Sequence, residues 1–243
     1  MMRAVLGIDS PEATAGLDAV EFRVDRKLPV SDQVYDALRS AIVRVQLRPG
    51  ALISENSIGR QFGVSRTPIR AALQRLAEEG LIDVFPQQGS FVAPIKLSDI
   101  MDSHFVRRSL ELAVLEEAAR LWSPDRSRIA HASIDAHRDQ VLSGDEEGFY
   151  ACDEQFHQLL TAFANKEGVW SVILAARARL MRFLRLFGGP ERLPVVIDEH
   201  RAIINALDEG DALRAREALA DHLDKVFQIL ERLPDKFRAY LSE

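Results

Sequence analysis

The chain has 243 residues, 47% of them hydrophobic, which is enough for one large or two ordinary domains with well-packed cores. Its single cysteine, Cys152, excludes an internal disulfide and suits a reducing cytoplasm, where we expect the protein to be located. No apolar run approaches the roughly 20 residues that cross a membrane, and the first residues lack the apolar core of a signal peptide. We therefore expect no membrane partner.

The formal net charge of −6 argues at first against a nucleic-acid partner, but the charge is unevenly distributed. Residues 29–96 hold eight Lys/Arg and six Asp/Glu, whereas residues 97–243 hold 19 and 26. A small basic domain is thus joined to a larger acidic one. This pattern is expected of a DNA-binding domain attached to an acidic partner domain.

The first 50 residues are predicted to contain a leader and one helix. Residues 1–28 are mixed in charge and lack sustained periodicity, so we interpret them as a flexible leader. A helix is predicted from Val30 to Gln46, before the break at Pro49-Gly50. Its apolar residues recur at helical spacing: Val34, Leu38, Ile42 and Val45.

Residues 64–76, VSRTPIRAALQRL, predict a short helix with one apolar face. Ser65 is a suitable N-cap, and Pro68 fits the first turn, where a missing N–H costs nothing. The apolar positions recur at i, i+4 and i+7: Ile69, Leu73 and Leu76. Arg66 and Arg70 lie on neighbouring turns away from that face. A helix with arginines near its N-terminus is typical of proteins that read the major groove of DNA.

The segments on either side support this interpretation. Before it, residues 54–62 predict another short helix, followed by a turn at Gly63-Val64. After it, Gly80 ends the helix, and residues 81–94 alternate like a β-hairpin around a Pro-Gln-Gln-Gly tip. Together these elements predict a winged helix-turn-helix. The alternative is a small helical subdomain with surface arginines.

The run RPGALISENSIGRQFGVSRTPIRAALQRLAEEGLI, with QQGSFV after it, resembles the DNA-binding domain of GntR-type bacterial transcription regulators. The resemblance implies a DNA-binding domain at residues 29–95. It also implies that Arg66 and Arg70 contact bases or nearby phosphates and that Gly89 enters the minor groove. The full set assigned to DNA contact is Arg66, Thr67, Arg70, Gln74, Gln88 and Gly89.

Two positions depart from the usual pattern of that family. Asn56 stands where many members carry an arginine that touches DNA, and Ala71 replaces a common glutamate. The fold expectation survives both departures, but the operator sequence does not follow from it.

After a short linker at residues 93–96, no strand-like alternation persists. Helices are predicted over residues 98–122, 126–142, 146–164, 167–187, 194–208 and 211–231. Amphipathic helices joined by short turns imply an antiparallel bundle of six or seven helices. We therefore expect a mainly α protein in which residues 96–243 form an all-helical domain for effector binding and dimerisation.

Four polar residues in this second part have the spacing of metal ligands. Asp153 and His157, four residues apart, project from one face of one helix and can chelate a divalent cation. His200 and His222 follow on the last two helices. One carboxylate and three imidazoles suit zinc, nickel, manganese or iron. Since a single histidine is more often a surface or core residue than a ligand, spacing alone leaves both interpretations open.

Residues 98–243 resemble the all-helical effector domain of the FadR branch of the GntR family (the FCD type), and in particular its metal-binding subgroup. The pattern D-x-x-x-H, then E-H, then a late helix with H-L is matched by Asp153, His157, His200 and His222. The resemblance implies one divalent metal ion per chain, zinc foremost. It also places Arg107, within VRRSLE, on the carboxylate of an effector, although Phe105 replaces the usual acid two residues earlier.

The remaining polar and aromatic candidates have ordinary interpretations. His104, His131 and His137 are expected to be solvated or partly buried, and Trp122 and Trp170 to be packing residues. Cys152 points about 100° away from Asp153 on the helix and is not counted as a ligand. The run RARLMRFLR at residues 177–185 predicts a solvated helix face, from which Arg177 can line the effector cavity.

The sequence therefore predicts a transcription regulator and not an enzyme. We expect a homodimer that binds inverted-repeat half-sites on double-stranded DNA and releases them when a small organic acid binds at the metal. One alternative is a metal-responsive regulator with a structural or sensing metal and no organic effector. Another is a metalloenzyme fused to a DNA-binding domain, since a metal with open positions can activate water. No general base lies near the ligands in the sequence, which argues against catalysis.

Overall fold

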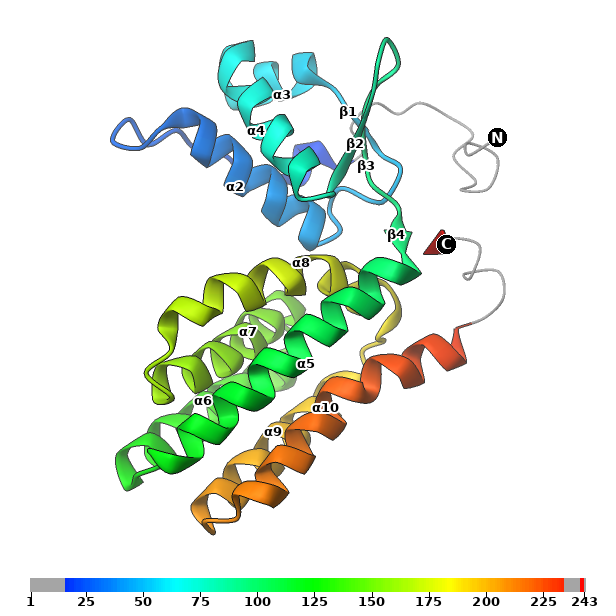
Figure 1. The fold of residues 1–243 in the computed structure, drawn as a ribbon. Coiled ribbons are helices and arrows are strands. Elements are labelled where there is room, and N and C mark those ends of the chain that lie inside the picture. Colours follow the sequence, from blue (N-terminus) through cyan, green and yellow to red (C-terminus); the bar gives the residue numbers. More distant parts are fainter. Residues whose placement is uncertain (1–15, 234–240, 243) are drawn as a thin grey trace. The chain divides into compact units, whose positions relative to one another are not determined.

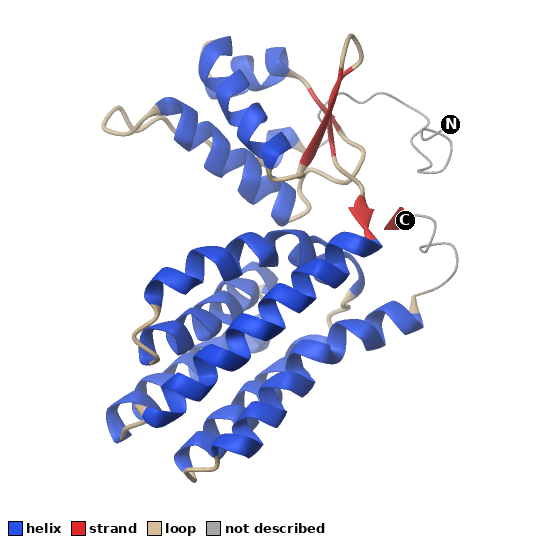
Figure 2. Ribbon diagram, in the orientation of Figure 1, coloured by secondary structure: helices blue, strands red, loops and turns tan. Residues whose placement is uncertain are grey.

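The computed structural model describes residues 16–233 and 241–242, which are mainly helical, as predicted (Figures 1 and 2). The chain divides into two compact units. One extends to Ile100 and includes residues 181–186, and the other comprises residues 101–180 and 187–233. Within the described part of the chain, no helix combines the length and the apolar character that a membrane span requires.

The last part of the expected leader packs into the core of the first unit. Its short 3-10 helix η1 (Leu17–Ala19) places Leu17 and Val20 in the apolar core of the first unit. Gly16 has φ +99°, and a Cβ there would lie 2.1 Å from the carbonyl oxygen of Gln46, so only glycine allows the close approach. The leader interpretation is therefore wrong for these residues, because sparse apolar residues without helical spacing still pack. Residues 1–15 lie outside the described part of the chain.

Helix α2 (Val30–Val43) ends earlier than predicted. The predicted apolar face is buried, with Val34, Leu38 and Ile42 fully covered. Val45, however, adopts φ +60° beyond the helix end, and the chain reverses there. The reversal brings Leu47, rather than Val45, into the core, and the N–H of Leu47 donates to the carbonyl of Ala41 at 3.1 Å.

Helices α3 (Glu55–Phe62) and α4 (Arg66–Glu78) form the predicted helix-turn-helix. The hydroxyl of Ser54 caps α3 by accepting from the N–H of Ser57, and Gly63, with φ +66°, makes the turn between the helices. Ser65 occupies the N-cap position of α4, but its side chain accepts no hydrogen bond from the helix. The predicted apolar face of α4 is buried at Ile69, Leu73 and Leu76, and Ala72 is buried beside it.

Helix α4 packs against α2 through a polar contact as well as apolar ones. The guanidinium of Arg75 lies over the ring of Tyr35, 3.7 Å from its centroid, and donates to Asp32 at 2.6 Å. Arg75 therefore faces α2, away from the side of α4 that carries Arg66 and Arg70.

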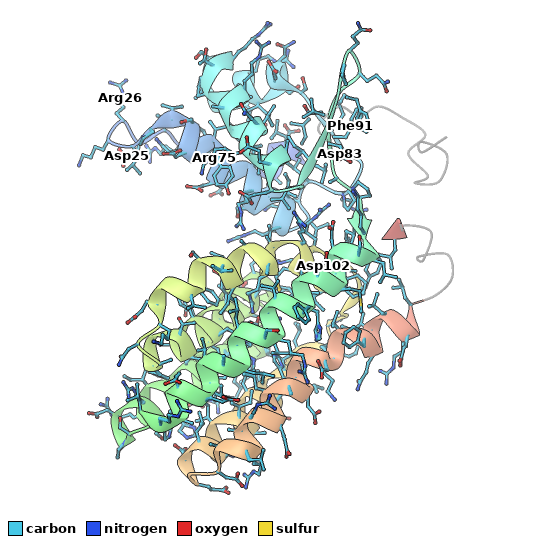
Figure 3. All side chains as sticks on the ribbon, in the orientation of Figure 1. Asp25, Arg26, Arg75, Asp83, Phe91 and Asp102 are labelled. Carbon is cyan, nitrogen blue, oxygen red and sulfur yellow. The ribbon has the colours of Figure 1, made fainter. Side chains whose placement is uncertain are left out.

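The wing is a three-stranded antiparallel sheet. Strands β2 (Ile82–Phe85) and β3 (Gly89–Val92) form the predicted hairpin, with Asp83 opposite Phe91 (Figure 3). Strand β1 (Leu52–Ile53) adds to the other edge of β3, which the hairpin prediction did not include. Two residues are too short a run to be recognised from alternation.

The predicted linker contains strand β4 (Ile95–Lys96), which pairs in parallel with β5 (Leu241–Ser242). Six α-helices then follow within a few residues of their predicted bounds. They are α5 (Leu97–Arg120), α6 (Pro124–Ser143), α7 (Glu146–Phe163), α8 (Trp170–Phe187), α9 (Arg192–Asp208) and α10 (Ala212–Arg232), with a 3-10 turn η2 (Glu167–Val169) before α8.

Local chemistry fixes where several of these helices begin. Three N-cap side chains accept a hydrogen bond from the backbone N–H three residues later: Ser123, Asp145 and Asp211. Trp122 packs edge-on against Phe163 and donates to Asp208 at 2.9 Å, which confirms its predicted packing role. Buried polar residues lie on each of the helices α5 to α10.

Candidate metal centre and nucleic-acid interface

The two arginines assigned to DNA are exposed at the start of α4. Nη2 of Arg66 donates to Oδ1 of Asn56 at 3.0 Å, and Nε of Arg70 lies 3.1 Å from a carboxylate oxygen of Glu55. Exposed pairs of this kind contribute at most about 1 kcal/mol, so either guanidinium can exchange its partner for a phosphate or a base. Asn56, the departure from the family pattern, thus lies beside Arg66.

The other residues assigned to DNA are exposed too. Thr67 and Gln74 lie on the outer side of α4, where Gln74 donates to Glu78 at 3.1 Å. Gln88 and Gly89 lie at the tip of the wing. Gly89 has φ +117°, a conformation that side chains rarely adopt, so the wing turn requires glycine there.

In the second unit, four side chains from three helices meet. Asp153 and His157 lie one turn apart on α7, His200 lies on α9 and His222 on α10. Their ligand atoms lie within 4.8 Å of one another, and all four residues are buried. The structure therefore brings together the four residues that the sequence suggested.

This donor set fits a transition-metal ion. A carboxylate oxygen with three imidazole nitrogens is acceptable to zinc, nickel, manganese and iron. His200 is fully buried, and neither of its ring nitrogens has a hydrogen-bond partner among the described residues. Its Nε2 faces Oδ1 of Asp153 at 3.6 Å, too far for a hydrogen bond. Since buried polar atoms normally have partners, a shared cation would satisfy both groups.

Burial keeps the imidazoles in the form that binds metals. It is the main cause that holds the pKa of His200 well below its usual value. Burial also lowers the pKa of His157 to about 4, although the nearby Glu111 carboxylate opposes the shift. The ring of His200 stacks on Phe156 with centroids 3.8 Å apart. The imidazoles of His157 and His200 are therefore neutral at physiological pH, with lone pairs available to a metal.

Two further carboxylates orient histidines of the cluster. Oε2 of Glu111 lies 2.6 Å from Nδ1 of His157, and Oε2 of Glu199 lies 2.8 Å from Nδ1 of His222. The hydrogen bond to Glu199 places the ring proton of His222 on Nδ1, which would leave its Nε2 free to bind a metal. Both guanidinium Nη atoms of Arg192 donate to Glu199, at 2.9 and 2.8 Å. Burial alone would raise the pKa of Glu199, but its hydrogen bonds lower it below the usual value.

Two arginines are buried beside the same cluster. Nε of Arg107 donates to Oε1 of Glu111 at 2.5 Å, and its Nη2 lies 2.9 Å from Nε2 of His157. Nη2 of Arg177 donates to Oδ2 of Asp153 at 2.7 Å. Burial would raise the pKa of Asp153, but Arg177 foremost, with the neighbouring imidazoles and Arg107, holds it well below its usual value. The centre therefore contains ionised carboxylates and charged guanidiniums in close contact.

The interpretation of His137 as a solvated or partly buried residue is wrong. This α6 residue is 1% exposed, and its ring centroid lies 5.5 Å from that of His200. Burial lowers its pKa. It is not one of the four clustered donors, but it lines the centre. The buried face of α6 consists of Ala130, Ile134 and His137. Their helical spacing was the signal in the sequence from which the burial of His137 could have been predicted.

Sequence reasoning also missed the two orienting carboxylates. Glu111 lies one helical turn after Arg107, and Glu199 directly precedes His200, so both were adjacent to recognised residues. Phe105, which replaces the usual acid, is 73% exposed and points away from the centre. Its substitution therefore does not alter the lining of the centre.

The other candidates are mostly as expected. His104 pairs with Asp224 and His131 with Asp208, each at 2.8 Å, and Cys152 is outside the metal cluster. The solvated face predicted for residues 177–185 is wrong for its buried arginines. Arg177 and Arg182 are only 1 and 2% exposed, because α8 also buries apolar residues on several sides.

Comparisons with known proteins agree with these features. The family described as "Bacterial regulatory proteins, gntR family" matches residues 30–92, and the FCD domain matches residues 102–225. An uncharacterized HTH-type transcriptional regulator of Streptomyces ambofaciens is 36% identical over 82% of this chain and 84% of its own length. The HTH-type transcriptional repressor RspR of Escherichia coli K12 is 30% identical over 92% of this chain and 99% of its own.

Solved structures show the same arrangement of elements. A putative GntR transcriptional regulator from Rhodococcus sp. RHA1 has a TM-score of 0.72 and 25% identity, covering 84% of this chain and 99% of its own. E. coli McbR/YncC has the same TM-score at 22% identity, covering 84% and 98%, and shares the fold. The winged helix-turn-helix, the helical domain and these relatives together show that the chain is a DNA-binding transcription regulator of the GntR family with an FCD domain.

Proposed function

We propose that the protein is a regulator whose affinity for its operator is controlled by a small carboxylate effector at a divalent metal ion in the FCD domain. The observation that carries the proposal is the buried centre of Asp153 and three histidines, flanked by Arg107 and Arg177. The four clustered side chains would hold the metal. When bound, the metal would supply positive charge and open coordination positions for a carboxylate.

Charge balance supports an acidic effector. The charges of Arg107 and Arg177 are matched by those of Glu111 and Asp153, and burial keeps the imidazoles of His157 and His200 neutral. A divalent cation would add two buried positive charges, which are costly without compensation. A dicarboxylate, hydroxy acid or sugar acid would compensate them. Arg107 would pair with an effector oxygen through charge-assisted hydrogen bonds, and Arg177 would line the same site.

The DNA-binding part of the proposal uses α4 and the wing. Residues 29–95 would form the DNA-binding domain, with Arg66, Thr67, Arg70 and Gln74 facing the major groove and Gln88 and Gly89 the minor groove. Residues 96–243 would bind the effector and join two chains, because paired winged helices on inverted half-sites give specificity. A relative that is 30% identical is named a repressor, so we propose that this regulator represses and acts in the cytoplasm.

Alanine at Arg66 or Arg70 is expected to weaken specific operator binding by roughly 1–3 kcal/mol, because each would remove a contact to a base edge. Titration of the native operator at fixed salt measures the effect. Arg75→Ala is the matched control from the same helix, since Arg75 contacts Asp32 and Tyr35. If both variants retain wild-type affinity, α4 does not read the operator.

The switch is tested with purified full-length protein. Dicarboxylates, hydroxy acids and sugar acids are screened by thermal shift, and hits are added to the operator titration. We expect a hit to release DNA from the wild type but not from Arg107→Ala or from metal-stripped protein, since the ligand must favour one arrangement of the dimer. An equal response of all three would place the effector site elsewhere. A response to metal alone would instead indicate a metal sensor without an organic effector.

A further inference from the structure

Arg107 contacts Nε2 of His157, a nitrogen that the proposed metal would need. Nε2 of His157 faces the guanidinium of Arg107, which can only donate, so Nε2 is the ring nitrogen that carries no proton. Nε2 then has a single lone pair. Nη2 of Arg107 lies 2.9 Å from that nitrogen and donates to it. A guanidinium N–H and a metal ion cannot share one lone pair, so the two are alternatives at His157.

Arg177 contacts the cluster differently. It donates to Oδ2 of Asp153 at 2.7 Å, whereas Oδ1 of the same carboxylate faces the histidines, 3.6 Å from Nε2 of His200. A carboxylate can bind a metal through one oxygen and an arginine through the other. Arg177 therefore supports Asp153 without blocking it, and the two buried arginines have separate roles.

We propose that Arg107 is a built-in competitor of the metal, which must leave Nε2 of His157 before the metal-binding set is complete. This inference rests on the metal part of the proposed function and adds an order of events to it. Arg107 remains anchored at Glu111 through Nε, at 2.5 Å, so only its Nη2 end needs to turn away. Once displaced, that end has lost its partner and is available to an effector carboxylate. Metal binding thus precedes and prepares effector binding.

The competition predicts that removing the guanidinium tightens metal binding. Zinc affinity is measured on full-length, metal-free protein by competition with a fluorescent chelator of known affinity. Arg107→Met removes both charge and donor. Arg107→Lys keeps a charge for Glu111, but it lacks the planar fork through which separate guanidinium nitrogens contact Glu111 and His157. We expect both variants to bind zinc about tenfold more tightly than wild type, because the metal no longer displaces a charged hydrogen bond.

The matched control is Arg108→Met. Arg108 is the neighbouring residue on α5 and pairs with Asp224 at 3.0 Å with a partly exposed side chain, so its loss should change zinc affinity by less than about twofold. Circular dichroism establishes that each variant is folded. If zinc affinity rises only in Arg107→Met, the guanidinium weakens zinc binding through charge repulsion alone. That result would overturn the proposed competition for the lone pair of His157.

The remaining outcomes separate this inference from the proposed function. If wild type binds zinc and the folded Arg107 variants bind it no more tightly, Arg107 is not a competitor, and the metal site stands. If zinc binds only to the Arg107 variants, Arg107 blocks the metal completely in wild type, which supports the competition. If zinc binds to none of the proteins, both the competition and the metal part of the proposed function are wrong.

Discussion

Replacing His200 by alanine is expected to abolish stoichiometric zinc binding and the stabilisation that zinc provides. His200 is fully buried with no hydrogen-bond partner for either ring nitrogen within the described structure, and a bound metal would satisfy the nitrogen that faces Asp153. Free zinc at 100 times its Kd stabilises a protein by about 2.7 kcal/mol. For a chain of this size, that free energy corresponds to a rise in Tm of about 5–10 °C.

The measurement compares bound zinc per chain and Tm, with zinc and with chelator, for wild type and His200→Ala. The control is His131→Ala, which removes an imidazole paired with Asp208 outside the cluster. That variant should keep one zinc per chain and the full rise in Tm. A His200→Ala protein that retained both would show that His200 is not a ligand.

One half of the metal-binding set could be predicted from the sequence, because its two residues have a spacing that is set by the helix itself. Asp153 and His157 are four residues apart, a spacing that places both on one helix face. His200 and His222 lie on other helices, and the sequence alone does not specify that these helices converge. Only the resemblance to the FCD family indicated that convergence before the fold was known.

What the sequence did not reveal depends on packing between distant segments. Whether Glu111 faces His157 is decided by how α5 lies against α7, a separation of 46 residues that no periodicity encodes. His137 was expected to be solvated or partly buried, because its nearness to His200 depends on how α6 packs against α9. Leu17 and Val20 were assigned to a leader because two apolar residues can pack against a core without forming a regular pattern.

Glu111→Ala is expected to destabilise the metal-free protein by about 3–5 kcal/mol, because it leaves a buried guanidinium without its carboxylate. Arg107 and Glu111 are 5 and 3% exposed, and their contact is 2.5 Å. Burial alone would raise the pKa of Glu111, but Arg107 and His157 outweigh it and hold the pKa well below its usual range, so the carboxylate is ionised. Its removal also frees Nδ1 of His157 from its only carboxylate contact within the described residues.

Denaturant unfolding of the FCD domain, recorded with chelator present, measures this loss of stability. Glu111→Gln keeps the size of the side chain and one accepting oxygen but not the charge, and should fall between wild type and Glu111→Ala. Glu117→Ala is the control from the same helix, because its pair with Arg120 is exposed and contributes at most about 1 kcal/mol. Equal stability of Glu111→Ala and Glu117→Ala would mean that Arg107 finds another anchor. In that case the pair with Glu111 would not stabilise the centre, and Arg107 would have no fixed point at Glu111 about which to turn.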